Sequence, residues 1–189
     1  MKNLSLLAVI GYLFFANVNV NAQTQFKPFR VDLGLGVAIP KHGVGFVFNV
    51  EPKYAVIPQL SVGLKIEGDA IVKDLKLDRS GDVAEGVAQG VFSILAAADY
   101  HLMQKNFRPF AGAGFGIYSI AAGDIETNTS TSDEIDGVTN FGVMLRAGFD
   151  ISHFRLALAY NFAGKDNLKN KSDFFSITVG AYFGGGRRK

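Results

Sequence analysis

The chain has 189 residues, with 22 glycines and 17 phenylalanines but no cysteine or tryptophan, and 19% of its residues are charged. This composition excludes a disulfide-stapled scaffold, a thiolate metal site and a disordered chain. The formal net charge of +2 is too small for a surface that tracks phosphates, so we expect no nucleic-acid partner.

Residues 1–22 have the features of a secretory signal peptide. Lys2 precedes an apolar stretch from Leu4 to Ala16, and small and polar residues then lead to a cleavage site between Ala22 and Gln23. The apolar stretch is shorter than the roughly 20 residues that a membrane-spanning helix requires. We therefore expect a signal peptide, residues 1–22, followed by one exported domain, residues 23–189.

After the signal peptide, apolar and polar residues alternate with a period of two, which is typical of β-strands. In each strand-length segment one face is apolar and uncharged, while the other collects the charged residues and many glycines. In the first segment, for example, Val31, Leu33 and Leu35 oppose Asp32 and Gly34. The segments, in chain order, are residues 29–39, 44–54, 60–69, 92–102, 109–117, 141–151, 154–162 and 175–183.

The crowding of glycine and charge on one face predicts a narrow barrel. Eight strands enclose an interior just wide enough for side chains, so long charged residues there need small neighbours. The opposite face is apolar and too extensive for the rest of the chain to cover, which a lipid bilayer permits for a closed barrel. The predicted fold is therefore all-β: an eight-stranded antiparallel transmembrane up-and-down β-barrel.

The connections between the segments alternate in length, as they do in membrane barrels. Three of them are long and polar, and we expect these to be external loops that could contact an extracellular partner: residues 73–85, 121–136 and 163–172. The remaining connections are short, including the first one on the external side, residues 40–43. With an even number of strands, the N- and C-terminal ends of the domain return to the same side.

Two segments resemble the small outer-membrane β-barrel proteins of Gram-negative bacteria, the OmpA/OmpX-like and porin-like families. They are Phe107–Tyr118, which reads FRPFAGAGFGIY, and the last strand, Ser176–Phe183. The resemblance extends over essentially all of the exported domain. It implies a location in the outer membrane, a surface in contact with outer-membrane lipid, and insertion by the barrel assembly machinery.

Within the last strand, Gly180, Tyr182 and Phe183 resemble the C-terminal signal that the assembly machinery reads. The chain departs from the family pattern because residues 184–189 follow the final aromatic residue.

No catalytic, metal or cofactor site is expected. The three histidines have no serine and acid at spacings that suggest a catalytic triad. His101 shares a strand face with Asp99, but two ligands alone do not make a metal site.

The inward faces carry charges of both signs in similar numbers. Because an unpaired buried charge is costly, we expect these side chains to form a cross-lumen salt-bridge network that plugs the barrel. The residues are Arg30, Asp32, Glu51, Lys53, Lys65, Glu67, Asp69, Asp99, Arg108, Arg146, Asp150 and Arg155.

These features together predict a non-enzymatic outer-membrane barrel with a structural or surface-interaction role and a narrow, charge-plugged lumen. One alternative is a small-solute porin, in which the same charges would form a selective constriction. A second alternative is a soluble exported barrel that binds an apolar ligand.

Overall fold

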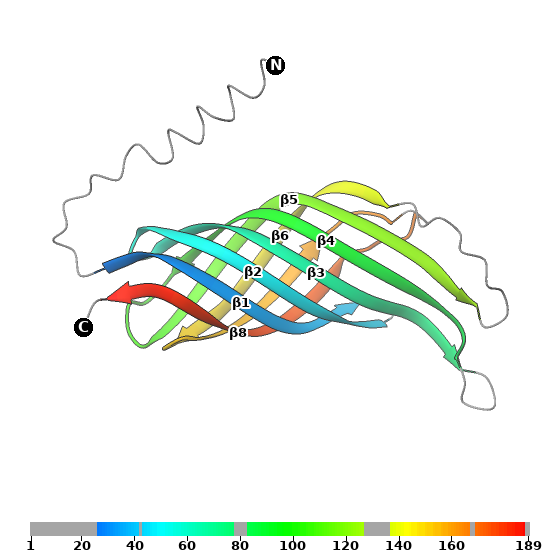
Figure 1. Ribbon diagram of the computed structural model, residues 1–189, viewed down its shortest axis with the longest axis horizontal. Coiled ribbons are helices and arrows are strands. Elements are labelled where there is room, and N and C mark those ends of the chain that lie inside the picture. Colours follow the sequence, from blue (N-terminus) through cyan, green and yellow to red (C-terminus); the bar gives the residue numbers. More distant parts are fainter. Residues whose placement is uncertain (1–25, 42, 78–82, 127–136, 167–168, 188–189) are drawn as a thin grey trace, which may run out of the picture.

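The computed structural model describes residues 26–41, 43–77, 83–126, 137–166 and 169–187. The predicted signal peptide and its cleavage site between Ala22 and Gln23 lie outside the described residues. The described chain folds into a long barrel of antiparallel strands (Figure 1). The strands are β1 (Phe26–Pro40), β2 (Gly43–Ile57), β3 (Leu60–Leu77), β4 (Val83–His101), β5 (Phe107–Glu126), β6 (Val138–Ile151), β7 (Phe154–Phe162) and β8 (Phe174–Arg187).

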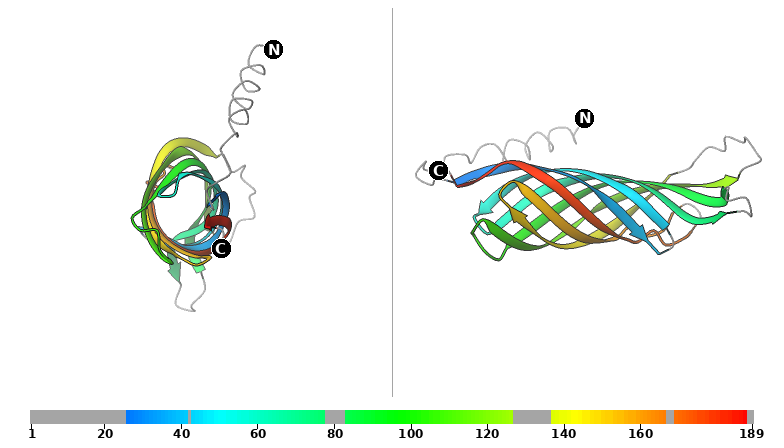
Figure 2. Two further views of the ribbon diagram at one scale, coloured as in Figure 1. Left: turned by 90° about the vertical axis from the view of Figure 1, so that its left-hand side faces the viewer. Right: turned by 90° about the horizontal axis from the view of Figure 1, so that it is seen from below.

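The strands follow one another around the barrel in chain order, and β1 closes it by pairing with β8. Gly34 of β1, for example, lies opposite Asn49 of β2 on one side and Gly180 of β8 on the other. The view along the barrel shows the closed ring (Figure 2). Phe26 pairs with Arg187, so β1 begins beside the end of β8. The predicted eight-stranded antiparallel up-and-down topology is confirmed.

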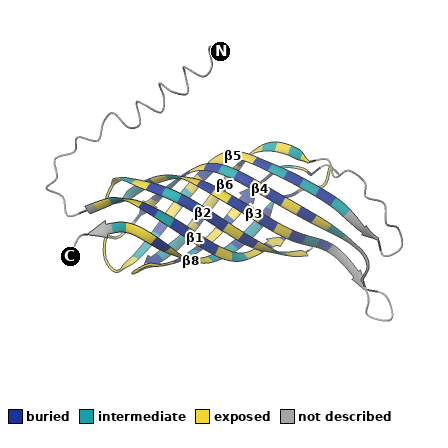
Figure 3. Ribbon diagram, viewed as in Figure 1, coloured by how far each residue is buried: buried dark blue, intermediate teal, exposed yellow. Residues whose placement is uncertain are grey.

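Buried and exposed positions alternate along the strands wherever their burial is described (Figure 3). In β2, Phe46 and Phe48 are exposed, while the intervening Val47 and the next residue, Asn49, are buried. The outer surface is dominated by large apolar side chains, and Phe141 is 71% exposed. A soluble barrel of this size would have the reverse arrangement, so the burial pattern matches the inverted arrangement that the sequence predicts.

Small inward residues let the strands curve around this narrow interior. A Cβ atom on Gly116 of β5 would lie 2.1 Å from the carbonyl oxygen of Ile94 on β4. A Cβ atom on Gly180 would lie 2.1 Å from the carbonyl oxygen of Leu33. These distances are far below van der Waals contact, so both positions require glycine as the structure stands. Close approach of the neighbouring backbone is therefore the physical reason for glycine at these two positions of the charged face.

Three strands are longer than the alternation predicts, and this corrects two of the predicted loops. β3 continues to Leu77 and β4 begins at Val83, so much of the predicted loop 73–85 is paired strand. β5 continues to Glu126, within the predicted loop 121–136. Figure 1 shows these strands extending past the ends of β1 and β2. Backbone pairing continues beyond the apolar band, where outward side chains no longer need to be apolar, so the alternation stops before the strands do.

The two ends of the barrel differ. At the end that holds Phe26 and Arg187, β2–β3, β4–β5 and β6–β7 are joined by short turns at residues 58–59, 102–106 and 152–153. We call this the turn end. The opposite end, called the loop end, carries the connections β3–β4, β5–β6 and β7–β8, together with the tight β1–β2 connection. Among the described residues, no helix is long and apolar enough to cross a membrane.

Candidate functional site

The interior near the turn end holds a balanced network of buried ion pairs, which we call the ionic layer. Its members come from β1, β2, β4, β6 and β7, so the contacts cross the lumen rather than following one strand. The cations are Arg30, Lys53, Arg146 and Arg155, and the anions are Asp32, Glu51, Asp99 and Asp150. All eight side chains are at most 8% exposed.

Asp99 of β4 is the centre of the ionic layer and is fully buried. It lies 2.7 Å from each of three cationic groups: Lys53 Nζ, Arg146 Nε and Arg155 Nη2. The side chain of Arg155 also stacks on the ring of Phe110, with its guanidinium carbon 3.8 Å from the ring centroid. A carboxylate with three charge-assisted contacts in a water-poor interior ties three other strands to β4.

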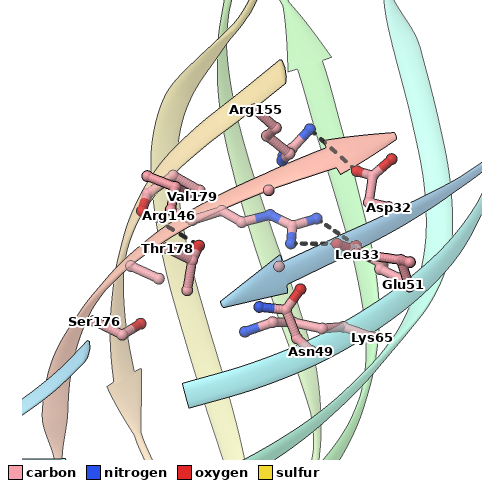
Figure 4. A pocket seen from close by; sticks show the side chains of 14 residues that line it. Asp32, Leu33, Asn49, Glu51, Lys65, Arg146, Arg155, Ser176, Thr178 and Val179 are labelled. Atoms are coloured by element: carbon pink, nitrogen blue, oxygen red, sulfur yellow. Dashed lines mark hydrogen bonds and ion pairs between the residues drawn. The ribbon is translucent and has the colours of Figure 1, made fainter. Parts of the chain in front are cut away.

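Arg146 links opposite walls of the barrel. It projects from β6 and donates two parallel hydrogen bonds to Glu51 of β2, with Nη1–Oε2 and Nη2–Oε1 distances of 2.8 and 2.6 Å (Figure 4). Lys53 lies 3.1 Å from the same Glu51 carboxylate and 2.7 Å from Asp32 of β1. The fork-shaped guanidinium fixes both the distance and the angle between the walls, which a flexible lysine would not do.

The edge of the ionic layer nearest the turn end is built around Asp150. Its Oδ2 accepts a hydrogen bond from Arg30 Nη1 at 2.8 Å, and its Oδ1 lies 3.2 Å from Arg155 Nη1. His101 Nε2 is 3.1 Å from Asp150 Oδ2, so this histidine contacts Asp150 rather than Asp99, which shares its strand face. Within the described part of the chain, no three acidic or histidine side chains are grouped to hold a metal ion.

Three of the charged residues expected in the network lie apart from the ionic layer, on the stretch of β3 that runs towards the loop end. Lys65 forms an ion pair with Glu67, and its Nζ lies 3.5 Å from the sulfur of Met144. Asp69 is buried with both carboxylate oxygens lacking a hydrogen-bond partner among the described residues. Arg108 also stands outside the ionic layer. The sequence places all of these residues on inward faces but does not show which of them meet.

A second layer, not anticipated from the sequence, fills the interior towards the loop end. Buried apolar side chains gather here among buried polar ones such as Gln89, Ser93 and Asn161, and we call the apolar group the apolar layer. Its members are Ala38, Val47, Ile71, Val91, Leu95, Ala97, Tyr118, Ile120, Met144, Ala159, Ala163 and Phe174. The sequence signal was a break in the alternation: Val47 stands among apolar neighbours in β2, and Leu95 interrupts the polar face of β4.

The two layers leave little free space in the lumen. A cavity of about 20 Å³ lies between Asn49, Lys65, Arg146, Arg155 and Ser176, and Figure 4 shows these side chains converging on it. A site of this volume has room for a single water molecule. The observed side-chain packing therefore gives no solute-sized passage at this point.

The residues that resemble an assembly signal lie in β8 and face different surroundings. Gly180 packs closely against β1, as described above, and Phe183 is 59% exposed on the outer surface. Tyr182 faces inward, and its hydroxyl donates a hydrogen bond to the carbonyl oxygen of Ser152. Of the histidines, His153 is exposed in the β6–β7 turn, and His42 lies outside the described residues.

Comparison with known proteins identifies the fold. No family model matches the chain, and no curated protein matches its sequence. Among solved structures, the neisserial surface protein A (NspA) is similar, with a TM-score of 0.58 and 16% identity over 84% of this chain and 96% of that one. The N-terminal barrel of Pseudomonas aeruginosa OprF gives a TM-score of 0.49 and 13% identity, covering 84% of this chain and 98% of that one.

The attachment invasion locus protein Ail of Yersinia pestis gives a TM-score of 0.44 and 11% identity, over 84% of this chain and 98% of that one. The similarity to NspA, together with the closed strand order, shows that this chain has the fold of the small eight-stranded outer-membrane β-barrels.

Proposed function

We propose that this protein is a non-enzymatic barrel of the bacterial outer membrane with a sealed lumen and a structural or surface-interaction role. The supporting observation is that two different layers fill the interior in series. A hydrated ion would have to displace the paired charges of the ionic layer and also cross the apolar layer. Both steps are unfavourable, because the first leaves charges unpaired and the second must displace closely packed buried side chains.

The outer surface supports the proposed membrane location. Large apolar side chains cover the outside of the barrel, including Phe29, Leu35, Phe115 and Phe141. A closed barrel satisfies its backbone hydrogen bonds internally, so this surface is compatible with lipid. In this proposal, residues 1–22 direct export and are removed, the barrel assembly machinery inserts the domain, and the turn end faces the periplasm.

The surface role is assigned to the loop end. The proposed contact regions are residues 73–85, 121–136 and 163–172, although the paired parts of the first two would present strand rather than flexible loop. Long connections on a rigid scaffold are the usual place for binding functions. The lumen offers no comparable opportunity, because buried side chains occupy it.

A planar-bilayer experiment distinguishes the sealed barrel from a small-solute porin. The refolded wild-type protein is expected to produce no steady single-channel openings. Arg146→Ala removes the side chain that joins opposite walls, and Lys169→Ala changes an exposed cation at the loop end as a matched control. Steady wild-type openings whose conductance changes in Arg146→Ala but not in Lys169→Ala would establish the porin function instead. Recovery of the protein in the periplasmic fraction without detergent would favour a soluble barrel that binds an apolar ligand.

A further inference from the structure

Arg108 is a cation that the ionic layer does not neutralise. It lies directly opposite Asp150 in the β5–β6 register, but the Asp150 carboxylate is already engaged by Arg30, Arg155 and His101. The ionic layer contains equal numbers of cations and anions without Arg108. The Arg108 guanidinium therefore exceeds the number of carboxylates available to it, and it lies at the edge of the ionic layer nearest the turn end.

The contacts of Arg108 are correspondingly poor. Its Nη2 reaches the carbonyl oxygen of Pro58 at 3.5 Å, which is a long hydrogen bond. Its Nε is buried and has no acceptor among the described residues. A buried donor without an acceptor costs free energy, and a charged one costs more, so the site favours an additional acceptor.

This guanidinium borders a small hollow at the mouth of the barrel. The hollow has a volume of about 10 Å³, and its lining includes three cationic side chains and no acidic one. The lining residues that matter here are Lys27, Arg30, Arg108, Ser61, Tyr182 and Gly185. The volume admits about one oxygen atom, so an oxyanion could insert one oxygen while the rest of the group stays outside.

The hollow also lies at an end of the barrel that carries described cations and no described acidic residue outside the ionic layer. Outside the lumen, the described cations at the turn end include the exposed Lys27 and Lys105. The acidic residues outside the predicted lumen network all fall in the sequence within residues 74–85, 124–136 and 166–173, which do not include the turn-end parts of the strands. An anion at the turn end therefore meets attraction from nearby cations and no competing carboxylate outside the ionic layer.

We propose that Arg108 and Lys27 form a binding site for a phosphate-type oxyanion at the turn end of the barrel. Guanidinium groups suit phosphate because their planar donors match its oxygens, and lysine adds a compact charge. Two sources supply this chemistry: inorganic phosphate and the headgroup of an anionic phospholipid. The exposed Phe29 and Tyr54 form a cross-strand pair near the same end, which places apolar outer surface close to the site and favours the lipid source.

Inorganic phosphate is the first probe. The ¹⁵N-labelled protein, folded in a phosphate-free maltoside detergent, is titrated while the arginine Nε–H resonances are recorded by NMR. Arg108 is expected to give a saturable shift. Arg108→Gln and Lys27→Gln should each weaken phosphate binding by about tenfold or more, as loss of a charge-assisted contact implies. Lys41→Gln, which removes an exposed cation at the loop end, should leave the affinity unchanged.

The lipid source is tested by adding phosphatidylglycerol or phosphatidylcholine to the same micelles. A larger Arg108 shift with phosphatidylglycerol than with phosphatidylcholine identifies the anionic lipid headgroup as the source. No shift with either lipid, beside saturable binding of inorganic phosphate, identifies the free anion; either result supports the oxyanion site. Only the lipid source depends on the proposed membrane location. The binding of inorganic phosphate in detergent depends neither on the membrane location nor on whether the lumen conducts ions.

Two results would overturn the site. One is the absence of a saturable wild-type shift, and the other is an Arg108→Gln protein that binds phosphate as tightly as wild type. Arg108→Lys provides a check if the glutamine variant does not fold, because it retains the charge but lacks the Nε donor; unchanged affinity in this variant excludes a role for that donor. Heat-dependent gel mobility confirms that each variant is folded before titration.

Discussion

At the scale of single residues, the ionic layer depends on carboxylates that serve several cations at once. Asp99 contacts Lys53, Arg146 and Arg155 at 2.7 Å each, and it has no exposure to solvent. The sequence shows an aspartate on an inward face, which is enough to predict pairing. It does not show that this aspartate is the common partner, because that depends on how strands far apart in the ring face one another across the lumen.

Asp99→Asn tests this central position. The substitution retains the size of the side chain but removes the charge that neutralises three buried cations. Breaking a buried ion pair on one side costs about 3–5 kcal/mol, so the free energy of unfolding should fall by about that amount. Urea-induced unfolding in vesicles or detergent micelles measures the change.

Asp173→Asn is the matched control for that experiment. Asp173 lies 3.0 Å from Lys171, whose side chain is 81% exposed, so solvent screens this pair. Loss of the Asp173 charge should lower the free energy of unfolding much less than loss of the Asp99 charge. Equal effects of the two substitutions would show that the ionic layer does not contribute as the geometry implies.

At the scale of the strand, the distance to the backbone of the adjacent strand decides which positions can carry a side chain larger than a hydrogen atom. β5 carries Gly112, Gly114 and Gly116 on its inward face, and the pattern predicted close packing there. Not every strand glycine has this role. Gly68 and Gly90 face the outer surface, and a Cβ atom at either position would meet nothing within 4 Å.

Gly116→Ala and Gly90→Ala form a matched pair for this argument. The first places a methyl group against the Ile94 carbonyl oxygen, where backbone must move, so we expect a loss of about 1–3 kcal/mol in unfolding free energy from overpacking. The second adds a methyl group in open space and should be nearly neutral. Denaturant titration of both proteins gives the comparison, and a Gly116→Ala protein as stable as Gly90→Ala would refute the packing argument.

At the scale of the whole molecule, the barrel places apolar residues outside and charged residues within. The outer surface is dominated by large apolar side chains, while side chains of the barrel itself occupy the interior. These two properties are the ones expected of the proposed sealed membrane barrel and not of a soluble carrier. They also explain why overall composition did not indicate a membrane barrel, since composition does not record which face a residue occupies.

Cell fractionation and gel mobility test this arrangement. The protein should sediment with outer membranes, resist extraction at high salt, and migrate differently on a denaturing gel before and after boiling. A tightly paired barrel remains folded in detergent until heated, which is the physical reason for the mobility shift. Recovery as a soluble protein with no heat-dependent shift would contradict the membrane location.

The sequence alone determined the number of strands, their order and the face on which each residue lies. This information is local, because successive side chains of a strand point to opposite sides. The strand ends beyond the apolar band were predicted poorly at Leu77, Val83 and Glu126, since pairing there continues without an alternating pattern.

Only the tertiary structure decided which inward residues meet. Contacts across the lumen depend on the stagger of all eight strands around the closed ring, which no single segment encodes. That stagger brings Arg146 to Glu51 and gathers Val47 and Phe174 into an apolar layer. It also leaves Arg108 without a carboxylate of its own, although the sequence placed it on the same faces as the residues that pair.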